Sequence, residues 1–225
     1  MEQLNITGVT ETVIQYLRIH IIEGNLAPGQ KLNEIELSSS LGISRPPLRE
    51  AFRVLQNEHL IVSIPRKGCY VSEVSAEGCR EIYEAREMIE CFAVDLFQIK
   101  GIMDLPKVAS ALKVSEGLVM PTSADPYEKY DYLKAIADFH ISLVESAGNS
   151  RLNHYYSANF SALARCQSLY VYIDGLMNKS QAIHEQILDY IQKGKYDQAK
   201  EKLTAHIRGF VPLMEEKINN QTKAQ

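Results

Sequence analysis

Apolar residues recur at every third or fourth position near the start of the chain and predict helices there. Within residues 10–23 the apolar residues of one helical side are Val13, Ile14, Leu17 and Ile21. Gly24 ends this helix, and the turn LAPGQKL follows it. Asn33 then caps a short helix, EIELSSSLG, which Gly42 closes.

The next helix is expected to begin at Ser44 and to run to about Glu58. The hydroxyl of Ser44 is expected to accept a hydrogen bond from the free N–H groups of the first turn. Two β-rich runs follow, Leu60–Ile64 and Cys69–Val74, and they flank the letters PRKG. This arrangement predicts a β-hairpin with a basic tip.

From Ser75 onward the pattern is helical. We expect six amphipathic helices, the fourth over residues 150–173 and the last running unbroken through KYDQAKEKLTAHIRGFVPLMEEKI. The connections are short, so neighbouring helices should pack antiparallel as a bundle. The pattern changes from strand to helix near residue 75, which predicts domains at 1–74 and 75–225.

The helix that begins at Ser44 has two distinct sides at about 100° per residue. The apolar side holds Leu48, Ala51, Phe52 and Leu55. The neighbouring side holds Arg45, Arg49 and Arg53. Two prolines, Pro46 and Pro47, occupy the first turn, where the missing N–H groups have no helical partner to lose.

Charge singles out the same region. The chain has a net charge of −4, yet residues 45–67 hold five basic against two acidic residues. Residues 73–225 hold 17 basic and 21 acidic residues. A local basic patch on an acidic chain indicates a surface for an anionic partner, although a solvated helix face would look the same.

Other compositional features narrow the class of protein. No run of about 18 apolar residues is present, so no membrane span is expected. The four cysteines are scattered and form no C-x-x-C pair, which is typical of reduced thiols in a cytoplasmic protein.

A short helix, a glycine turn and a second helix that begins with arginines are typical of a helix-turn-helix, whose second helix enters the major groove of DNA. The basic hairpin would form a wing beside it. The alternative is a small α+β domain with a solvated basic rim. The residues expected to bind DNA are Ser44, Arg45, Arg49, Arg53, Arg66, Lys67 and Gly68.

The segment LAPGQKLNEIELSSSLGISRPPLREAFRVLQNEHLIVSIPRKGCYV resembles the winged helix of the GntR family of bacterial transcription regulators. The family pattern is LxPGxxLxExxLAxxLGVSRxPVREAL, then LxxxGLV, then RxGxxV. The resemblance implies that Arg45 and Arg49 are the main DNA-contacting side chains and that Gly68 is the glycine of the wing tip. Pro46 stands where many members have a hydroxyl residue, and Ile35 where many have a basic one.

Three histidines, His140, His184 and His206, lie on three different predicted helices. Such a set can hold zinc or a similar metal, but it is more often unrelated. Residues 80–210 resemble the FadR C-terminal domain of this family, whose metal-binding members use an aspartate and three histidines. The resemblance places these three residues on the histidine positions. Ile136 stands at the aspartate position, and Asp138 points about 200° away from His140.

The resemblance therefore implies a divalent metal, zinc or nickel, on three imidazoles without the usual aspartate. Alternatively, the histidines bind an anionic effector directly. Arg86 and Glu90 lie one turn apart and form either a surface ion pair or, as the resemblance implies, an effector cavity in which Arg86 clamps a carboxylate.

The fold class we expect is mainly α: an N-terminal winged helix-turn-helix with a small β-hairpin, then an antiparallel all-helical bundle. The function we expect is that of a homodimeric, cytoplasmic transcription regulator, not an enzyme. It would bind a DNA operator under the control of a small organic acid bound in the bundle. The rivals are a metal-dependent hydrolase, for which no general base is evident, and an architectural DNA-binding protein, which leaves the bundle unexplained.

Overall fold

The computed structural model describes residues 6–223 and divides the chain into two compact units, residues 1–74 and 75–225. Among the described residues, no helix is both long and apolar enough to cross a membrane. Each unit has its own apolar core, and the two are described separately.

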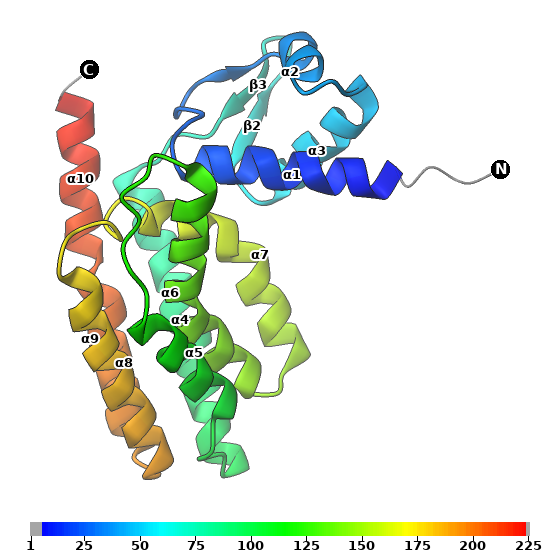
Figure 1. Cartoon of the computed structure of the whole chain (residues 1–225). Coiled ribbons are helices and arrows are strands. Elements are labelled where there is room, and N and C mark those ends of the chain that lie inside the picture. The colour runs from blue at the N-terminus through cyan, green and yellow to red at the C-terminus, as the bar shows by residue number, and fades with distance from the viewer. Residues whose placement is uncertain (1–5, 224–225) are drawn as a thin grey trace. The chain divides into compact units, whose positions relative to one another are not determined.

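The first unit combines three helices with a small antiparallel sheet among its described residues (Figure 1). In chain order they are α1 (Ile6–Ile22), β1 (Lys31–Leu32), α2 (Glu34–Ser40), α3 (Arg45–Asn57), β2 (Ile61–Ile64) and β3 (Gly68–Val71). Helices α1 and α3 pack together through side chains that are fully or almost fully buried, among them Leu17, Ile21, Leu48 and Leu55. The expected helices and hairpin of this unit are therefore confirmed.

Strand β1 was not predicted. It pairs antiparallel with β3, and β3 pairs antiparallel with β2, so the sheet order is β1-β3-β2. A strand of two residues has no period, which is why the apolar pattern does not reveal it. Tyr70 lies at the centre of the sheet, opposite Lys31 on one side and Val62 on the other.

Within the described part of this unit, two residues other than glycine adopt a left-handed backbone. His59, with φ of 58°, ends α3 in a Schellman motif, in which the N–H of Leu60 donates to the carbonyl of Leu55 and that of His59 to Gln56. Arg66, with φ of 65°, lies at the tip of the hairpin. The N–H of Lys67 donates to the carbonyl of Ile64 there, closing a type II turn.

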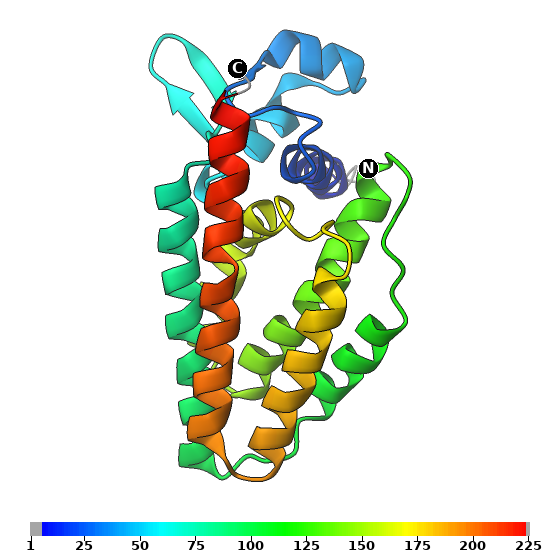
Figure 2. The ribbon, with the colours of Figure 1, turned by 90° about the vertical axis from the view of Figure 1, so that its left-hand side faces the viewer.

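The second unit is a helical bundle (Figure 2). Its helices are α4 (Ala76–Lys100), α5 (Pro106–Glu116), α6 (Pro126–Ser146), α7 (Ser150–Gln167), α8 (Leu176–Gln192), α9 (Tyr196–Gly209) and α10 (Val211–Lys223). Helix α4 is central and packs against α6, α7, α9 and α10. The mainly α fold class, with a winged helix-turn-helix followed by a helical bundle, is confirmed.

Two helix boundaries in the bundle differ from the prediction. Helix α7 ends at Gln167, and residues 168–175 form a turn. The last predicted helix is two helices, because Pro212 has no N–H to donate and its ring clashes with the carbonyl four residues earlier. The ladder of hydrogen bonds is therefore interrupted between Gly209 and Val211.

Candidate functional site

Helix α3 presents its arginines to solvent and its apolar side to the core. Arg45, Arg49 and Arg53 are exposed, while Leu48, Ala51, Phe52 and Leu55 are buried. The Nε of Arg49 donates to Glu34 Oε2 of α2 across 2.8 Å, and Arg53 pairs with Glu50 across 3.3 Å. This face of α3 is cationic, with Glu34 and Glu50 as its acidic neighbours.

The predicted capping bond of Ser44 is wrong. Ser44 does occupy the N-cap position of α3 with extended backbone, but its side chain makes no capping hydrogen bond. A cap accepts from the N–H of the second or third helical residue, and those residues are Pro46 and Pro47, which have none. The exposed hydroxyl of Ser44 is therefore not engaged by the helix start, and the prolines fix that start by their restricted φ.

The hairpin tip exposes Arg66, Lys67 and Gly68. Arg66 takes the left-handed conformation that a type II turn requires at this position, where glycine is usual. Gly68 has φ of 109°, a conformation that side-chain-bearing residues rarely adopt. Ile35 on α2 is 60% exposed.

In the bundle, His140 of α6, His184 of α8 and His206 of α9 converge as expected. One ring nitrogen from each lies within 4.8 Å of the others, and all three side chains are buried. The Nε2 atoms of His184 and His206 are 2.9 Å apart. Burial lowers the pKa of each histidine well below 6.5, and the positive charge of Arg86 lowers it further. The three imidazoles are therefore neutral at pH 7, the form that binds metal.

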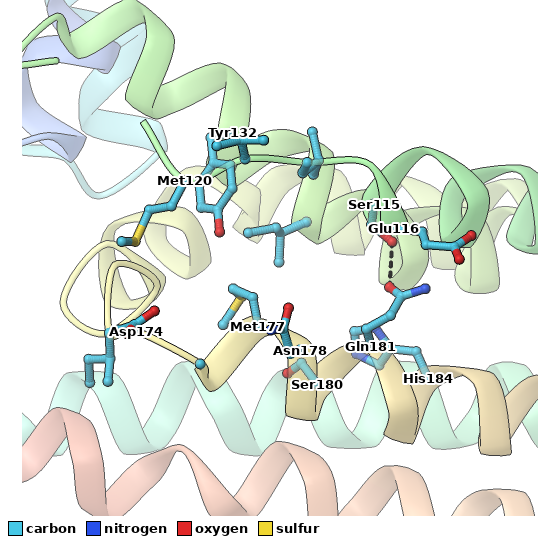
Figure 3. A pocket seen from close by; sticks show the side chains of 15 residues that line it. Ser115, Glu116, Met120, Tyr132, Asp174, Met177, Asn178, Ser180, Gln181 and His184 are labelled. Atoms are coloured by element: carbon cyan, nitrogen blue, oxygen red, sulfur yellow. Dashed lines mark hydrogen bonds between the residues drawn. The ribbon is translucent and has the colours of Figure 1, made fainter. Parts of the chain in front are cut away.

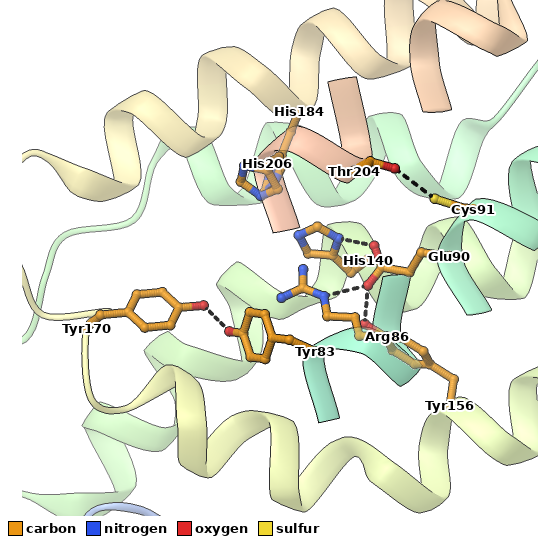
Figure 4. Close-up of polar contacts among 10 residues, drawn as sticks. All are labelled: Tyr83, Arg86, Glu90, Cys91, His140, Tyr156, Tyr170, His184, Thr204 and His206. Atoms are coloured by element: carbon orange, nitrogen blue, oxygen red, sulfur yellow. Dashed lines mark hydrogen bonds and ion pairs between the residues drawn. The ribbon is translucent and has the colours of Figure 1, made fainter. Parts of the chain in front are cut away.

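Glu90 of α4 joins the histidine cluster to a buried polar network, which the sequence did not reveal (Figure 4). One of its oxygens lies 2.7 Å from His140 Nδ1, and the other accepts from Arg86 Nε at 2.7 Å and from the Tyr156 hydroxyl at 2.8 Å. If Nδ1 of His140 carries the proton toward Glu90, its Nε2 keeps a free lone pair. A carboxylate behind an imidazole in this way is typical of metal sites.

Of the two alternatives for Arg86 and Glu90, the surface ion pair is wrong, because the two side chains are only 1% and 0% exposed. Glu90 uses only the Nε of Arg86. Neither terminal nitrogen of Arg86 has a hydrogen-bond partner of good geometry among the described residues, although Arg86 lies near enough to the Tyr170 hydroxyl to lower the pKa of that group. A buried guanidinium with two unpaired donors is costly unless a ligand completes it.

Two cavities meet at this network. A small one of about 10 Å³, room for a single water, is lined by Arg86, the three histidines and Tyr170, among others. A larger one of about 420 Å³ lies between α8 and the segments of α5 and α6 (Figure 3). Ile136, Met177, Ser180 and His184 line both cavities, so they form the wall between them.

The position at which the resemblance implies an aspartate holds an apolar side chain, Ile136. Ile136 is half-buried in the shared wall and has no donor atom to offer a metal. Asp138 is exposed and absent from the cluster, as the helical angle predicted. The donor set is therefore three imidazoles, with Glu90 behind one of them.

Comparison with known proteins matches a separate family to each of the two units. Residues 9–71 match the gntR family of bacterial regulatory proteins, and residues 81–209, more than half of the chain, match the FCD domain. The HTH-type transcriptional regulator YdhC of Bacillus subtilis (strain 168) is 25% identical over 210 residues, which are 92% of each chain. The gluconate operon transcriptional repressor of Bacillus licheniformis is 31% identical over 144 residues, covering 62% of this chain and 54% of that one.

Among solved structures, a transcriptional regulator GntR from Rhodococcus sp. RHA1 superimposes with a TM-score of 0.71. It covers 91% of this chain and 96% of its own, at 23% identity, and so supports the fold. The chain belongs to the GntR family. It is a DNA-binding transcription regulator whose helical unit is an FCD effector-binding domain, and it is not an enzyme.

Proposed function

We propose that a small organic acid binds between Arg86 and the three histidines and thereby controls the affinity of this regulator for its operator. The observation that carries the proposal is the buried guanidinium of Arg86, whose two terminal nitrogens are unpaired beside the histidine cluster. A planar guanidinium presents two parallel N–H groups to a carboxylate, and burial strengthens such a pair. The 420 Å³ cavity behind Ile136 and Met177 gives room for the rest of the molecule.

The donor set also fits a divalent metal. Zinc or nickel would be held by His140, His184 and His206, which are neutral, buried and within reach of one centre. When bound, such an ion would supply a Lewis-acidic anchor for the effector's carboxylate. Without a fourth protein ligand at position 136, the ion would keep a position open for that oxygen.

The effector proposal is tested by a thermal-shift screen of small mono- and dicarboxylates, followed by calorimetry. A carboxylate that binds the protein should bind Arg86→Lys at least about tenfold more weakly, because lysine keeps the charge but loses the planar fork. Arg80→Lys, a surface arginine on the same helix, is the matched control and should bind normally. Equal affinity in Arg86→Lys would refute the role of the guanidinium.

The metal proposal needs a separate measurement. Protein purified without a tag should contain, or take up, about one equivalent of zinc or nickel by elemental analysis. His184→Ala should lose it, whereas His154→Ala, an exposed histidine of α7, should not. Less than about 0.1 equivalent after incubation with either metal would leave the direct binding of an anion by the histidines as the better account.

For DNA, we propose that Arg45 and Arg49 contact the operator from the major groove. Ser44 and Arg53 would bind the neighbouring phosphates, and Arg66, Lys67 and Gly68 the groove beside the wing. Selection from a random DNA library should enrich a two-fold related sequence. Arg49→Ala should then weaken operator binding by about 1–3 kcal/mol. An unchanged midpoint in a gel-shift titration would remove Arg49 from base recognition.

We further propose that the regulator is a cytoplasmic homodimer that pairs through α4. Met88 and Phe92 are exposed on one side of this helix and line a surface groove of about 490 Å³ with Tyr155 of α7. Phe92→Lys should give a monomer in light scattering, whereas Val114→Lys, at an exposed apolar site on α5, should stay dimeric. The effector then acts by favouring one placement of the two DNA-binding units, through its differential affinity for the two arrangements.

A further inference from the structure

Two cysteines far apart in the sequence meet inside the helical unit. Cys79 lies in the first turn of α4 and Cys166 near the end of α7, and their Sγ atoms are 2.9 Å apart. This is closer than the roughly 3.5–4.0 Å at which non-bonded heavy atoms attract best. A disulfide bond is about 2.05 Å long, so the sulfurs need to approach by only about 0.9 Å.

The surroundings shift the pKa values of the two thiols in opposite directions. Either sulfur can be the donor in the neutral pair, but an ionised Cys79 accepts from the thiol of Cys166. This hydrogen bond lowers the pKa of Cys79, and the positive charge of Arg165 lowers it further. The same hydrogen bond and burial raise the pKa of Cys166. Cys79 is therefore the better nucleophile, and Cys166 lies in place to react with it afterwards.

A second contact runs beside the thiol pair, one turn further along both segments. The hydroxyls of Tyr83 and Tyr170 are hydrogen-bonded to each other, and each tyrosine follows its cysteine by four residues (Figure 4). Tyr170 also lines the small cavity and stacks on Phe210, whose ring meets His206 edge-on at 4.9 Å. A bond between the sulfurs would fix α4 to α7 beside the small cavity, which Arg86 of α4 and Gln167 of α7 help to line.

We propose that Cys79 and Cys166 form a peroxide-sensitive dithiol that closes to an intramolecular disulfide. Hydrogen peroxide is the oxidant, since it is small enough to enter a buried site. The sulfur of Cys79 attacks one peroxide oxygen, the O–O bond breaks, and hydroxide leaves and is protonated to water, giving a sulfenic acid. The sulfur of Cys166 then attacks that of Cys79, and the hydroxyl leaves as a second water with the thiol proton.

This inference goes beyond the binding of an effector and does not depend on it. It gives the domain a second input, in which oxidation constrains the packing of α4 against α7, the two helices whose Arg86 and Gln167 line the small cavity. The bridge closes a loop between residues 87 apart, so it restricts the unfolded chain strongly. Reduction by a dithiol should reverse it.

The test uses the full chain, reduced, desalted and treated with a small excess of hydrogen peroxide. The number of free thiols measured in denaturant should fall from four to two, and the intact mass by about 2 Da. A non-reducing peptide map should show Cys79 linked to Cys166. The melting midpoint should rise by about 10 °C, and dithiothreitol should restore the original thiols, mass and midpoint.

Variants separate this pair from the other two cysteines. The double variant Cys69→Ser/Cys91→Ser should still lose two thiols to peroxide, whereas Cys79→Ala and Cys166→Ala should each form no intramolecular bridge. Persistence of all four thiols in the wild-type chain would overturn the proposal. So would a bridge that involves Cys69 or Cys91, or the addition of oxygen atoms to cysteine without a bridge.

Discussion

Arg49 of α3 is bound to Glu34 of α2 through its Nε, with 2.8 Å between Nε and Oε2. The contact joins the helix that would enter the groove to the helix before it. Because Glu34 accepts from Nε, it leaves the two terminal nitrogens of Arg49 available, and these are the pair that can bridge O6 and N7 of a guanine. In the proposed complex, Glu34 would therefore orient the arginine and would also place a negative charge near the DNA.

Removing Glu34 should separate these two effects. Glu34→Ala should raise the affinity for random DNA, because one negative charge is lost. The affinity for the operator should rise less, because Arg49 is no longer held in the orientation that reads a base. We expect the ratio of operator to random affinity to fall by about 3–10-fold, measured by fluorescence anisotropy at two salt concentrations. Glu36→Ala removes the same charge from the same helix and should leave the ratio unchanged. Equal ratios for the two variants would contradict the orienting role.

Glu90 is the residue on which the buried network of the bundle depends. Glu90→Gln would leave the Arg86 charge without its partner in a site with almost no exposure. We expect the free energy of unfolding of the helical unit to fall by about 3–5 kcal/mol in urea titrations. Glu87 lies on the same helix as Glu90 and pairs with Arg208 of α9 near the surface. Glu87→Gln should lower the free energy of unfolding by less than about 1 kcal/mol. Similar losses in both variants would show that the Arg86–Glu90 pair is not essential for stability.

The histidine cluster should make the metal-free protein sensitive to acid. The pKa values of His140, His184 and His206 are lowered below the unfolded value of 6.5, so the unfolded chain binds more protons as the pH falls through that value. Above pH 6.5 the three histidines are neutral in both states and do not reduce the free energy of unfolding. Below pH 6.5 the free energy of unfolding falls, by up to about 2 kcal/mol for each histidine at pH 5. Chelator-treated protein should show this in urea titrations between pH 7.5 and 5.

Single variants identify the groups responsible for the acid sensitivity. His206→Gln should reduce the loss of stability between pH 7.5 and 5 by about a third, since one of three such groups is removed. His154→Gln changes an exposed residue and should leave the pH dependence intact. A pH dependence that is unaltered in His206→Gln would mean that other groups cause the acid sensitivity.

The sequence predicted the elements with strong periodicity and the residues that carry a family pattern. The two sides of α3 follow from helical spacing, and the convergence of His140, His184 and His206 follows from the resemblance. The pairing of Glu90 with Arg86 follows from their spacing, but its contacts with His140 and Tyr156 could not be predicted, because a buried carboxylate in an amphipathic helix looks like a surface residue until its partners from α6 and α7 are placed. The contact of Cys79 with Cys166 likewise depends on tertiary packing between segments 87 residues apart.

Local rules also failed where two of them competed. Serine at an N-cap normally accepts from the first turn, but the prolines that favour the same helix start remove the donors. The proline that follows Val211 divides a segment whose apolar spacing alone predicts one helix. In both places the missing N–H of proline decided the outcome.

His59 occupies a position that favours glycine, and replacing it should stabilise the first unit. It ends α3 with φ of 58° in a Schellman motif, at the point where the family pattern LxxxGLV has its glycine. A side-chain-bearing residue in this conformation costs about 1 kcal/mol, and only part of that is offset by the greater freedom of glycine in the unfolded chain. His59→Gly should therefore raise the free energy of unfolding by about 0.5 kcal/mol, and His59→Val should lower it by more than 1 kcal/mol, about the cost of a β-branched residue at positive φ. His20→Gly, a change in the last turn of α1 in the same unit, should destabilise it by up to about 1 kcal/mol instead. Chemical denaturation of the three variants measures the sign directly, and a loss of stability in His59→Gly would show that the imidazole makes a compensating contact.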